Sequence, residues 1–127
     1  MRLAAKLAWL AAVGALGTLA RFGLSGVVQR LLGTGFPWGT LVVNALGCLL
    51  FGIVWSLAEE RLVISGETRL IVLVGFMGAF TTFSTFAFET AAMLRDAEWL
   101  YATANLLAHN VLGVACFFAG SSIGRAL

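Results

Sequence analysis

Charged side chains are scarce in this chain. Only 11% of its 127 residues are Asp, Glu, Lys or Arg, whereas 61% are hydrophobic, and a soluble domain usually carries about 25% charged residues. A helix needs roughly 20 apolar residues to cross the hydrocarbon core of a bilayer. The length therefore allows four or five crossings joined by short loops, with no room for a separate soluble domain. The composition predicts an all-α integral membrane protein.

Polar, basic, cysteine and histidine residues are also few or isolated, and this narrows the possible classes of function. The polar density of an enzyme is missing, and the basic residues occur singly, which argues against a nucleic-acid partner. The two cysteines, Cys48 and Cys116, lie in apolar stretches, where a packing role is favoured over a disulfide or a metal site. The only histidine, His109, has no second His or paired Cys to complete a site, so we expect no zinc or iron.

The hydrophobic pattern predicts one transmembrane domain over residues 1–127, with spans at about 7–28, 38–58, 70–94 and 99–123. The only proline, Pro37, opens the second span, where a missing N–H costs nothing. Arg2 and Lys6 before an apolar run imitate a signal peptide. The apolar character resumes after Arg21, however, and this favours a spanning helix.

The basic residues are unevenly distributed between the two ends of the predicted bundle. Five lie on the side of the termini and two on the opposite side: Arg2, Lys6, Arg61, Arg69 and Arg125 against Arg30 and Arg95. Taken alone, this bias favours termini in the cytoplasm.

Two predicted spans carry a polar stripe. In the first, Gly14, Gly17, Arg21 and Ser25 recur at intervals of three or four and share one helical face. An arginine at this depth is costly unless it meets water, an anion or a carboxylate, so it is either a vestibule residue or a snorkelling end charge. In the second, Thr40, Asn44, Gly47 and Phe51 share a face. The Asn44 amide either makes an interhelical hydrogen bond, worth about 1 kcal/mol, or lines a pore.

The third span combines glycines and hydroxyl residues at mid-membrane, from Gly75 to Phe86. Threonine hydroxyls that can bond freed backbone groups predict a helix break between about Gly75 and Thr85, buried in protein. Such a break directs carbonyl groups at a cation in many transport proteins. Phe83 and Phe86 would face one way, and Glu89 needs a paired or water-filled environment.

The fourth span carries a ladder at steps of four: Tyr101, Asn105, His109, Gly113 and Phe117. Its first three members can form hydrogen bonds, so the ladder is a candidate polar track.

Taken together, these motifs resemble the Fluc (CrcB-type) fluoride channel family. The resemblance rests on Gly17 with Arg21, on residues 37–44 with Gly47, and on residues 75–86, which end in Thr-Thr-Phe-Ser-Thr-Phe. It implies an antiparallel, dual-topology homodimer in the cell inner membrane that exports fluoride down its gradient through two narrow pores and catalyses no reaction.

The resemblance also implies roles for individual residues. The implied pore residues are Phe83, Phe86, Asn44, Thr82, Ser84, Asn105 and His109, with Arg21 at the vestibule. The backbone carbonyls of Gly78 and Thr81 would bind a structural Na⁺ ion at the dimer centre. A narrow path must replace the water shell of fluoride with donors, and the positive edge of a phenylalanine ring can meet an anion.

Two features depart from the family pattern. Asn105 and His109 stand where tyrosine and serine are expected, so His109 either donates a hydrogen bond to fluoride or makes conduction pH-dependent by gaining charge. The uneven basic residues leave open a heterodimer with an oppositely oriented paralogue.

Two other functions stay open at this point. A proton-coupled small multidrug exporter also has four short spans, but it needs an acid in the membrane, and the only embedded one is Glu89. A non-transporting scaffold subunit would use the glycines only to pack helices.

Overall fold

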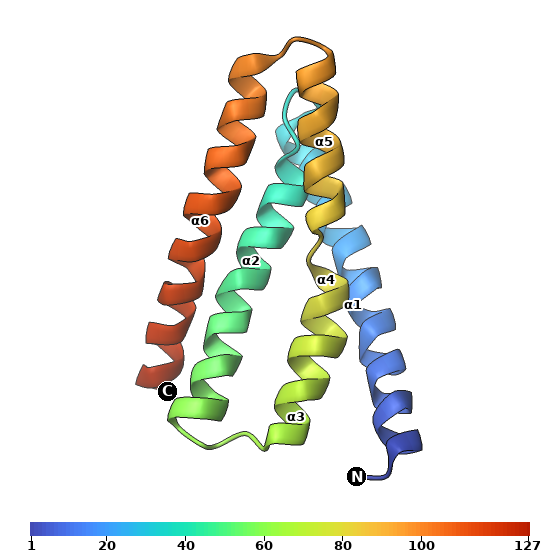
Figure 1. Cartoon of the computed structure of the whole chain (residues 1–127), viewed down its shortest axis with the longest axis vertical. Helices are drawn as coiled ribbons and strands as arrows, with labels where there is room; N and C mark the ends of the chain where they lie inside the picture. Colours follow the sequence, from blue (N-terminus) through green and yellow to red (C-terminus); the bar gives the residue numbers. More distant parts are fainter.

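The computed structural model describes all residues from Met1 to Leu127 and contains only helices. Four of them are long and apolar enough to cross a membrane: Leu3–Leu32, Trp38–Glu60, Gly66–Arg95 and Trp99–Ala126. This confirms the predicted number of apolar helices. They run up and down in turn, so both termini and the second loop lie at one end (Figure 1).

Two of the four spans are single helices and two are built from several helical segments. The first span is the single helix α1, Leu3–Leu32, and the fourth is the single helix α6, Trp99–Ala126. The second consists of α2, Trp38–Trp55, which continues into the π-helical turn η1, Ser56–Glu60. The third consists of α3, Gly66–Leu70, the π-helical segment η2, Ile71–Met77, the short α4, Gly78–Phe80, and α5, Phe83–Arg95.

The loop between α1 and α2 is held by one side chain. Pro37 lies just before α2, at the capping position rather than inside the helix, and cannot cap it with a side-chain hydrogen bond. Gln29 does so instead: its Oε1 accepts from the Gly39 N–H at 3.1 Å, and its Nε2 donates to the Phe36 carbonyl at 2.8 Å and to the Gly33 carbonyl. The amide of Gln29 thus fixes the start of the second span.

Glycines allow the helices to approach closely. A Cβ atom on Gly120 of α6 would meet the carbonyl oxygen of Leu49 and lie 2.8 Å from its carbonyl carbon. A Cβ on Gly17 of α1 would meet the carbonyl oxygen of Phe76 in η2. Small residues of this kind are typical of helix interfaces in membranes. As a result, α2 packs on α6, and α1 packs on the first half of the third span.

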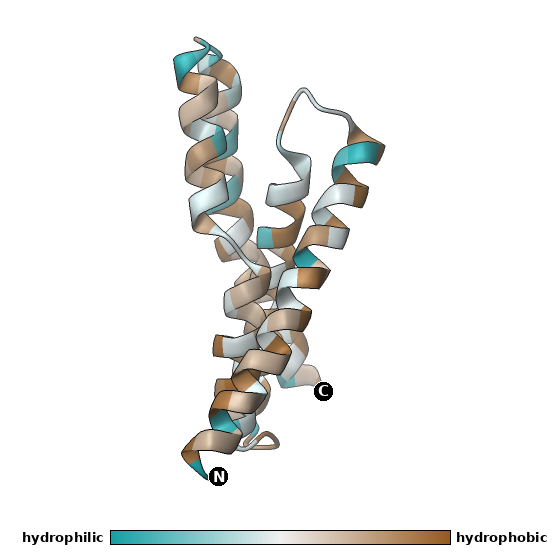
Figure 2. Ribbon diagram, turned by 90° about the vertical axis from the view of Figure 1, so that its right-hand side faces the viewer, coloured by the Kyte–Doolittle hydropathy of each residue, from teal (hydrophilic) through white to brown (hydrophobic).

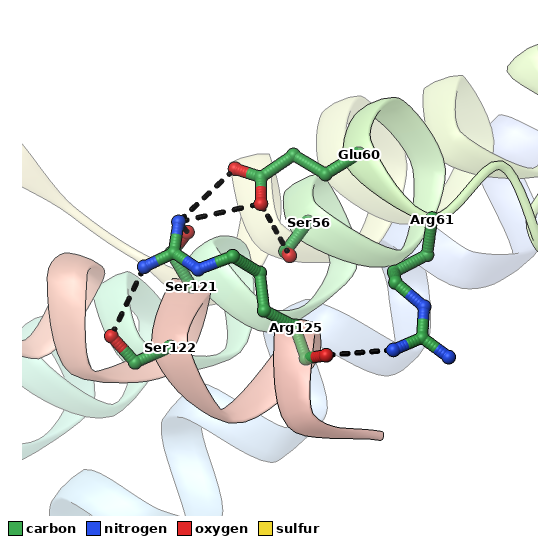
Figure 3. A network of polar contacts seen from close by, with 6 residues as sticks. All are labelled: Ser56, Glu60, Arg61, Ser121, Ser122 and Arg125. Atoms are coloured by element: carbon green, nitrogen blue, oxygen red, sulfur yellow. Dashed lines mark hydrogen bonds and ion pairs between the residues drawn. The ribbon is translucent and has the colours of Figure 1, made fainter.

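A polar network joins the ends of the second helix and α6 (Figure 3). Arg125 donates to both carboxylate oxygens of Glu60 at 3.3 Å and to the hydroxyl groups of Ser121 and Ser122, while Ser56 donates to Glu60. Both partners of the ion pair are substantially exposed, so it is worth only about 0–1 kcal/mol. The network therefore fixes the position of the end of the second helix relative to the end of α6, and adds little to the stability of the fold.

The outside of the bundle is apolar. Only 21 of the 127 residues are buried, and exposed large hydrophobic side chains occur on every long helix. Hydrophobic residues occur along the length of the helices, and several of the most hydrophilic positions lie near their ends (Figure 2). A helix surface of this kind needs lipid or another protein against it. The chain is a multi-pass membrane protein.

Candidate functional site

The third span is interrupted at Thr81 and Thr82, near its middle. Thr81 has φ −89° and ψ 158°, and Thr82 has φ −149° and ψ 113°, so both are extended. The Thr81 hydroxyl donates back to the Met77 carbonyl at 2.9 Å, and the Thr82 hydroxyl oxygen caps α5 by accepting from the Thr85 N–H at 3.2 Å. The break lies within the predicted range, Gly75 to Thr85. Its two threonines provide hydrogen bonds to the ends of the flanking helical segments, Thr81 to the preceding one and Thr82 to α5.

Asn44 of α2 holds the break open. Its Nδ2 donates to the Thr82 carbonyl at 3.0 Å, and its Oδ1 accepts from the Thr82 N–H at 2.8 Å. The amide thereby satisfies both backbone groups of one extended residue, as a neighbouring strand would. The interhelical hydrogen bond considered for Asn44 is therefore present. One N–H of the amide remains beyond this bridge, because the NH₂ group has two.

The break frees two carbonyl groups. In a continuous helix the carbonyl of Gly78 would accept from the Thr82 N–H, and that of Thr81 from the Thr85 N–H. Here the first N–H donates to Asn44 and the second to the Thr82 hydroxyl. Gly78 and Thr81 are the residues whose carbonyls were expected to bind sodium, and both carbonyls lack their usual helical donors.

A groove of about 340 Å³ adjoins the break on the side of α6. Phe83 and Phe86 lie on its wall with their ring centroids 5.5 Å apart, and the Phe86 ring packs against His109 at 4.2 Å. The lining residues come from α2, the break, α5 and α6: Asn44, Gly47, Cys48, Phe51, Thr81, Thr82, Phe83, Phe86, His109, Asn110 and Phe117.

A second cavity of about 290 Å³ lies on the side of α1. It is lined mainly by polar groups: Thr18, Arg21, Phe22, Ser25, Thr40, Val43, Thr82 and Thr85. The Arg21 Nε is buried and has no hydrogen-bond partner. Thr82 lines this cavity and the groove, so the Asn44–Thr82 bridge lies at the boundary of the two spaces.

Two of the candidate pore residues lie outside the groove. Asn105 is completely buried and donates from Nδ2 to the Thr90 hydroxyl at 2.9 Å, toward α5. Ser84 is exposed, with its hydroxyl 3.3 Å from that of Thr82. The structure thus brings five of the seven candidate pore residues together at the groove: Asn44, Thr82, Phe83, Phe86 and His109. In the single subunit, Ser84 and Asn105 do not line it.

Several residues at the site had no clear signal in the sequence. Asn110 and Thr85 line the two spaces, but a lone hydroxyl or amide in a membrane helix does not show which way it points. The partner of Glu89 is Thr40, whose hydroxyl donates to the carboxylate at 2.7 Å. Thr40 was noted only as a member of a polar face.

Four apolar helices, a mid-span break and two flanking cavities define a small multi-pass membrane protein with a transport-type broken helix. The chain belongs to the CrcB family: the family model described as CrcB-like protein, Camphor Resistance (CrcB), matches residues 8–121.

Relatives cover nearly the whole chain. A protein of Nitrosococcus oceani named "Fluoride-specific ion channel FluC" is 63% identical over 120 residues, which is 94% of this chain and 96% of the relative. Proteins with the same name from Solidesulfovibrio magneticus and Desulforapulum autotrophicum are 54% and 52% identical, each over 94% of this chain and 96% of the relative.

Proposed function

We propose that this chain is a fluoride-selective ion channel of the cell inner membrane that exports fluoride down its electrochemical gradient. Its relatives carry the name of a fluoride channel, not of an enzyme, over nearly its full length. This disfavours the multidrug exporter and the scaffold subunit. The observation that carries the proposal is the Asn44–Thr82 bridge, which keeps a helix open beside two phenylalanines and a groove.

The broken helix offers two kinds of ion site. The amino end of α5, at Phe83, carries partial positive charge and free backbone N–H groups, which favour an anion. The carboxyl end of α4, at Phe80, carries partial negative charge, which favours a cation. Discontinuous helices use both ends in this way in membrane transport.

The phenylalanine rings suit an anion that must shed water. Ring edges carry the positive part of the quadrupole, and Phe83 and Phe86 meet at an interplanar angle of 60°, so their faces are not stacked. Fluoride between such edges and the donors of Asn44 and Thr82 would exchange its hydration for fixed partners. If the partner subunit narrows this path in the dimer, a larger halide would be excluded by its size.

The proposal predicts a selective flux from the purified chain alone. Liposomes loaded with fluoride should lose it rapidly once the membrane potential is clamped, while liposomes loaded with chloride should retain it. Ion-selective electrodes measure both anions, and liposomes without protein give the background. Equal release of the two halides, or no fluoride release from well-folded protein, would contradict the proposal.

An antiparallel homodimer would complete the site. Phe83 is 77% exposed in the single chain and Ser84 is also exposed, although both lie at mid-span. Irregular backbone and hydroxyl groups at this depth need protein or water against them. Because the break is near the middle of its span, inverting a second copy in the membrane would keep its break at the same depth.

We expect the dimer to contain both orientations. A single cysteine added after Leu127, in a variant whose two native cysteines are replaced by alanine, should be labelled by impermeant reagents from either side of sealed vesicles. A variant with the cysteine placed in the Gly33–Gly35 loop should give the same result. Labelling from one side only would support instead a heterodimer with an oppositely oriented paralogue.

A sodium ion would fit between the two breaks of such a dimer. The carbonyls of Gly78 and Thr81 have lost their helical donors, and carbonyl oxygens are the ligands that hard cations accept. Gly78 is exposed in the single chain, on a surface that a partner would cover. A bound sodium ion would add positive charge close to the anion path and link the two broken helices.

A further inference from the structure

The two cysteines of the chain lie on facing helices, and both are free. Cys48 belongs to α2 and Cys116 to α6. These helices pack closely: a Cβ atom on Gly52 of α2 would lie 2.8 Å from the backbone nitrogen of Ser121 in α6. Cys48 precedes Gly52 by four residues and therefore shares the face of α2 that meets α6.

The thiol of Cys48 points at α6. Its Sγ lies 3.6 Å from the position that a Cβ on Gly113 would take, and it is the only atom of another helix within 4 Å of that position. Because glycine has no side chain, there is room for an added atom between this sulfur and α6.

Cys116 lies on the face of α6 that meets α2. It follows Gly113 by three residues and precedes Gly120 by four, which is the spacing of one helical face. Gly113 faces Cys48, and Gly120 faces the carbonyl group of Leu49. The ionisation of the Cys48 thiol is influenced by Cys116, as expected for two thiols that are neighbours in space. The two sulfurs thus lie across one helix contact.

The pair of thiols is accessible, but it has no further ligands. Both cysteines are half-buried, and Cys48 is part of the groove wall. The chain contains no group of three or more His, Cys, Asp or Glu side chains that could hold a metal ion. Structural zinc sites use four ligands, so zinc does not suit this pair. Thiolates select soft metal ions, and some of these ions accept two sulfurs alone, in a linear arrangement.

Charge selects among the soft ions. Copper(I), silver(I) and mercury(II) all accept two sulfurs in a line. Two thiolates leave a negative charge on the complex with a monovalent ion, whereas they neutralise Hg²⁺. No basic side chain other than His109 lines the groove, and an unpaired charge is costly where water is scarce. The site therefore favours Hg²⁺.

We infer that Cys48 and Cys116 form a two-sulfur site for the mercuric ion, which bridges α2 and α6 at the edge of the groove. Each thiol loses its proton to water and forms a bond to Hg²⁺, so two protons are released for each ion bound. The bound ion ties together two walls of the groove and blocks fluoride efflux. The binding site stands independently of the proposed function, and the block rests on it.

The first test measures binding to the purified chain. After incubation with Hg²⁺ and removal of loosely bound ion by a monothiol such as glutathione, wild type should retain one ion per chain, with two sulfur neighbours in X-ray absorption. Cys48→Ser and Cys116→Ser, each with one sulfur left, should bind about 100-fold more weakly or less, because the second bond is intramolecular. Zn²⁺ should be lost under the same conditions. Equal retention by a single-cysteine variant, or restored retention in a mixed dimer of the two variants, would overturn the intrachain site.

The second test measures fluoride efflux from liposomes in the same monothiol. Hg²⁺ should block wild type, an excess of a dithiol such as dithiothreitol should restore the flux, and Cys116→Ser should conduct with and without Hg²⁺. Normal efflux from wild type that retains the ion, or an equal block of Cys116→Ser, would contradict the proposed block. Absence of efflux before Hg²⁺ is added would instead refute the proposed channel, and the binding measurement would still test the site.

Discussion

Replacing Asn44 by leucine is expected to reduce fluoride efflux by at least about tenfold while the chain stays folded. Leucine has nearly the same size but removes the donor and the acceptor that hold Thr82, each worth about 1–3 kcal/mol if its partner is left unpaired. The relaxed alternative is for the Thr82 N–H to return to the Gly78 carbonyl, which closes the break. Efflux from liposomes and thermal unfolding in detergent measure the two effects.

A suitable control for Asn44→Leu is Thr103→Val. The Thr103 hydroxyl also makes a hydrogen bond, to the Trp99 carbonyl at 2.8 Å, but on an exposed face of α6. Its loss should leave fluoride efflux unchanged. Wild-type efflux from Asn44→Leu would show that the bridge does not keep the pathway open.

Phe83→Ile is expected to abolish fluoride efflux with almost no effect on the stability of the single chain. Isoleucine keeps apolar bulk but has no ring edge for an anion. Phe83 is 77% exposed, so the chain itself has little packing to lose. Phe86→Ile should also abolish efflux, but with a stability cost, because Phe86 is 7% exposed and its ring supports His109.

The matched control for Phe83→Ile is Phe88→Ile on the same helix, where the ring is 65% exposed and is not part of the groove wall. Its efflux should match that of wild type. If Phe83→Ile and Phe88→Ile lowered flux equally, the rings would act only as packing surface. If Phe83→Ile conducted normally, the assignment of this ring to the pore would be wrong.

The sequence was sufficient for the four helices because long apolar stretches have few alternatives in a chain of this length. It located the break only to Gly75–Thr85, since glycine and threonine weaken a helix throughout that stretch. What fixes the break at Thr81 and Thr82 is the Asn44 amide, which is brought there by the packing of α2. That contact is tertiary and has no local pattern.

The ladder of the fourth span shows the limit of counting residues along a helix. A step of four residues turns about 40° too far in a helix of 3.6 residues per turn, so successive members drift around α6. His109 consequently faces the groove, whereas Asn105, one step earlier, donates to Thr90 of α5. Of the ladder proposed as a polar track, His109 and Phe117 line the groove, and Tyr101, Asn105 and Gly113 do not.

The two halves of the third span belong to different packing units. The η2 and α4 half lies against α1, where Gly17 approaches the backbone of Phe76, while α5 lies against α6. Their joint is a pair of extended residues clamped to α2 by one amide. A tilt of the α5–α6 unit relative to the α1 unit would therefore pivot at Thr82, and because Thr82 lines the groove and the Arg21 cavity, one movement would resize both.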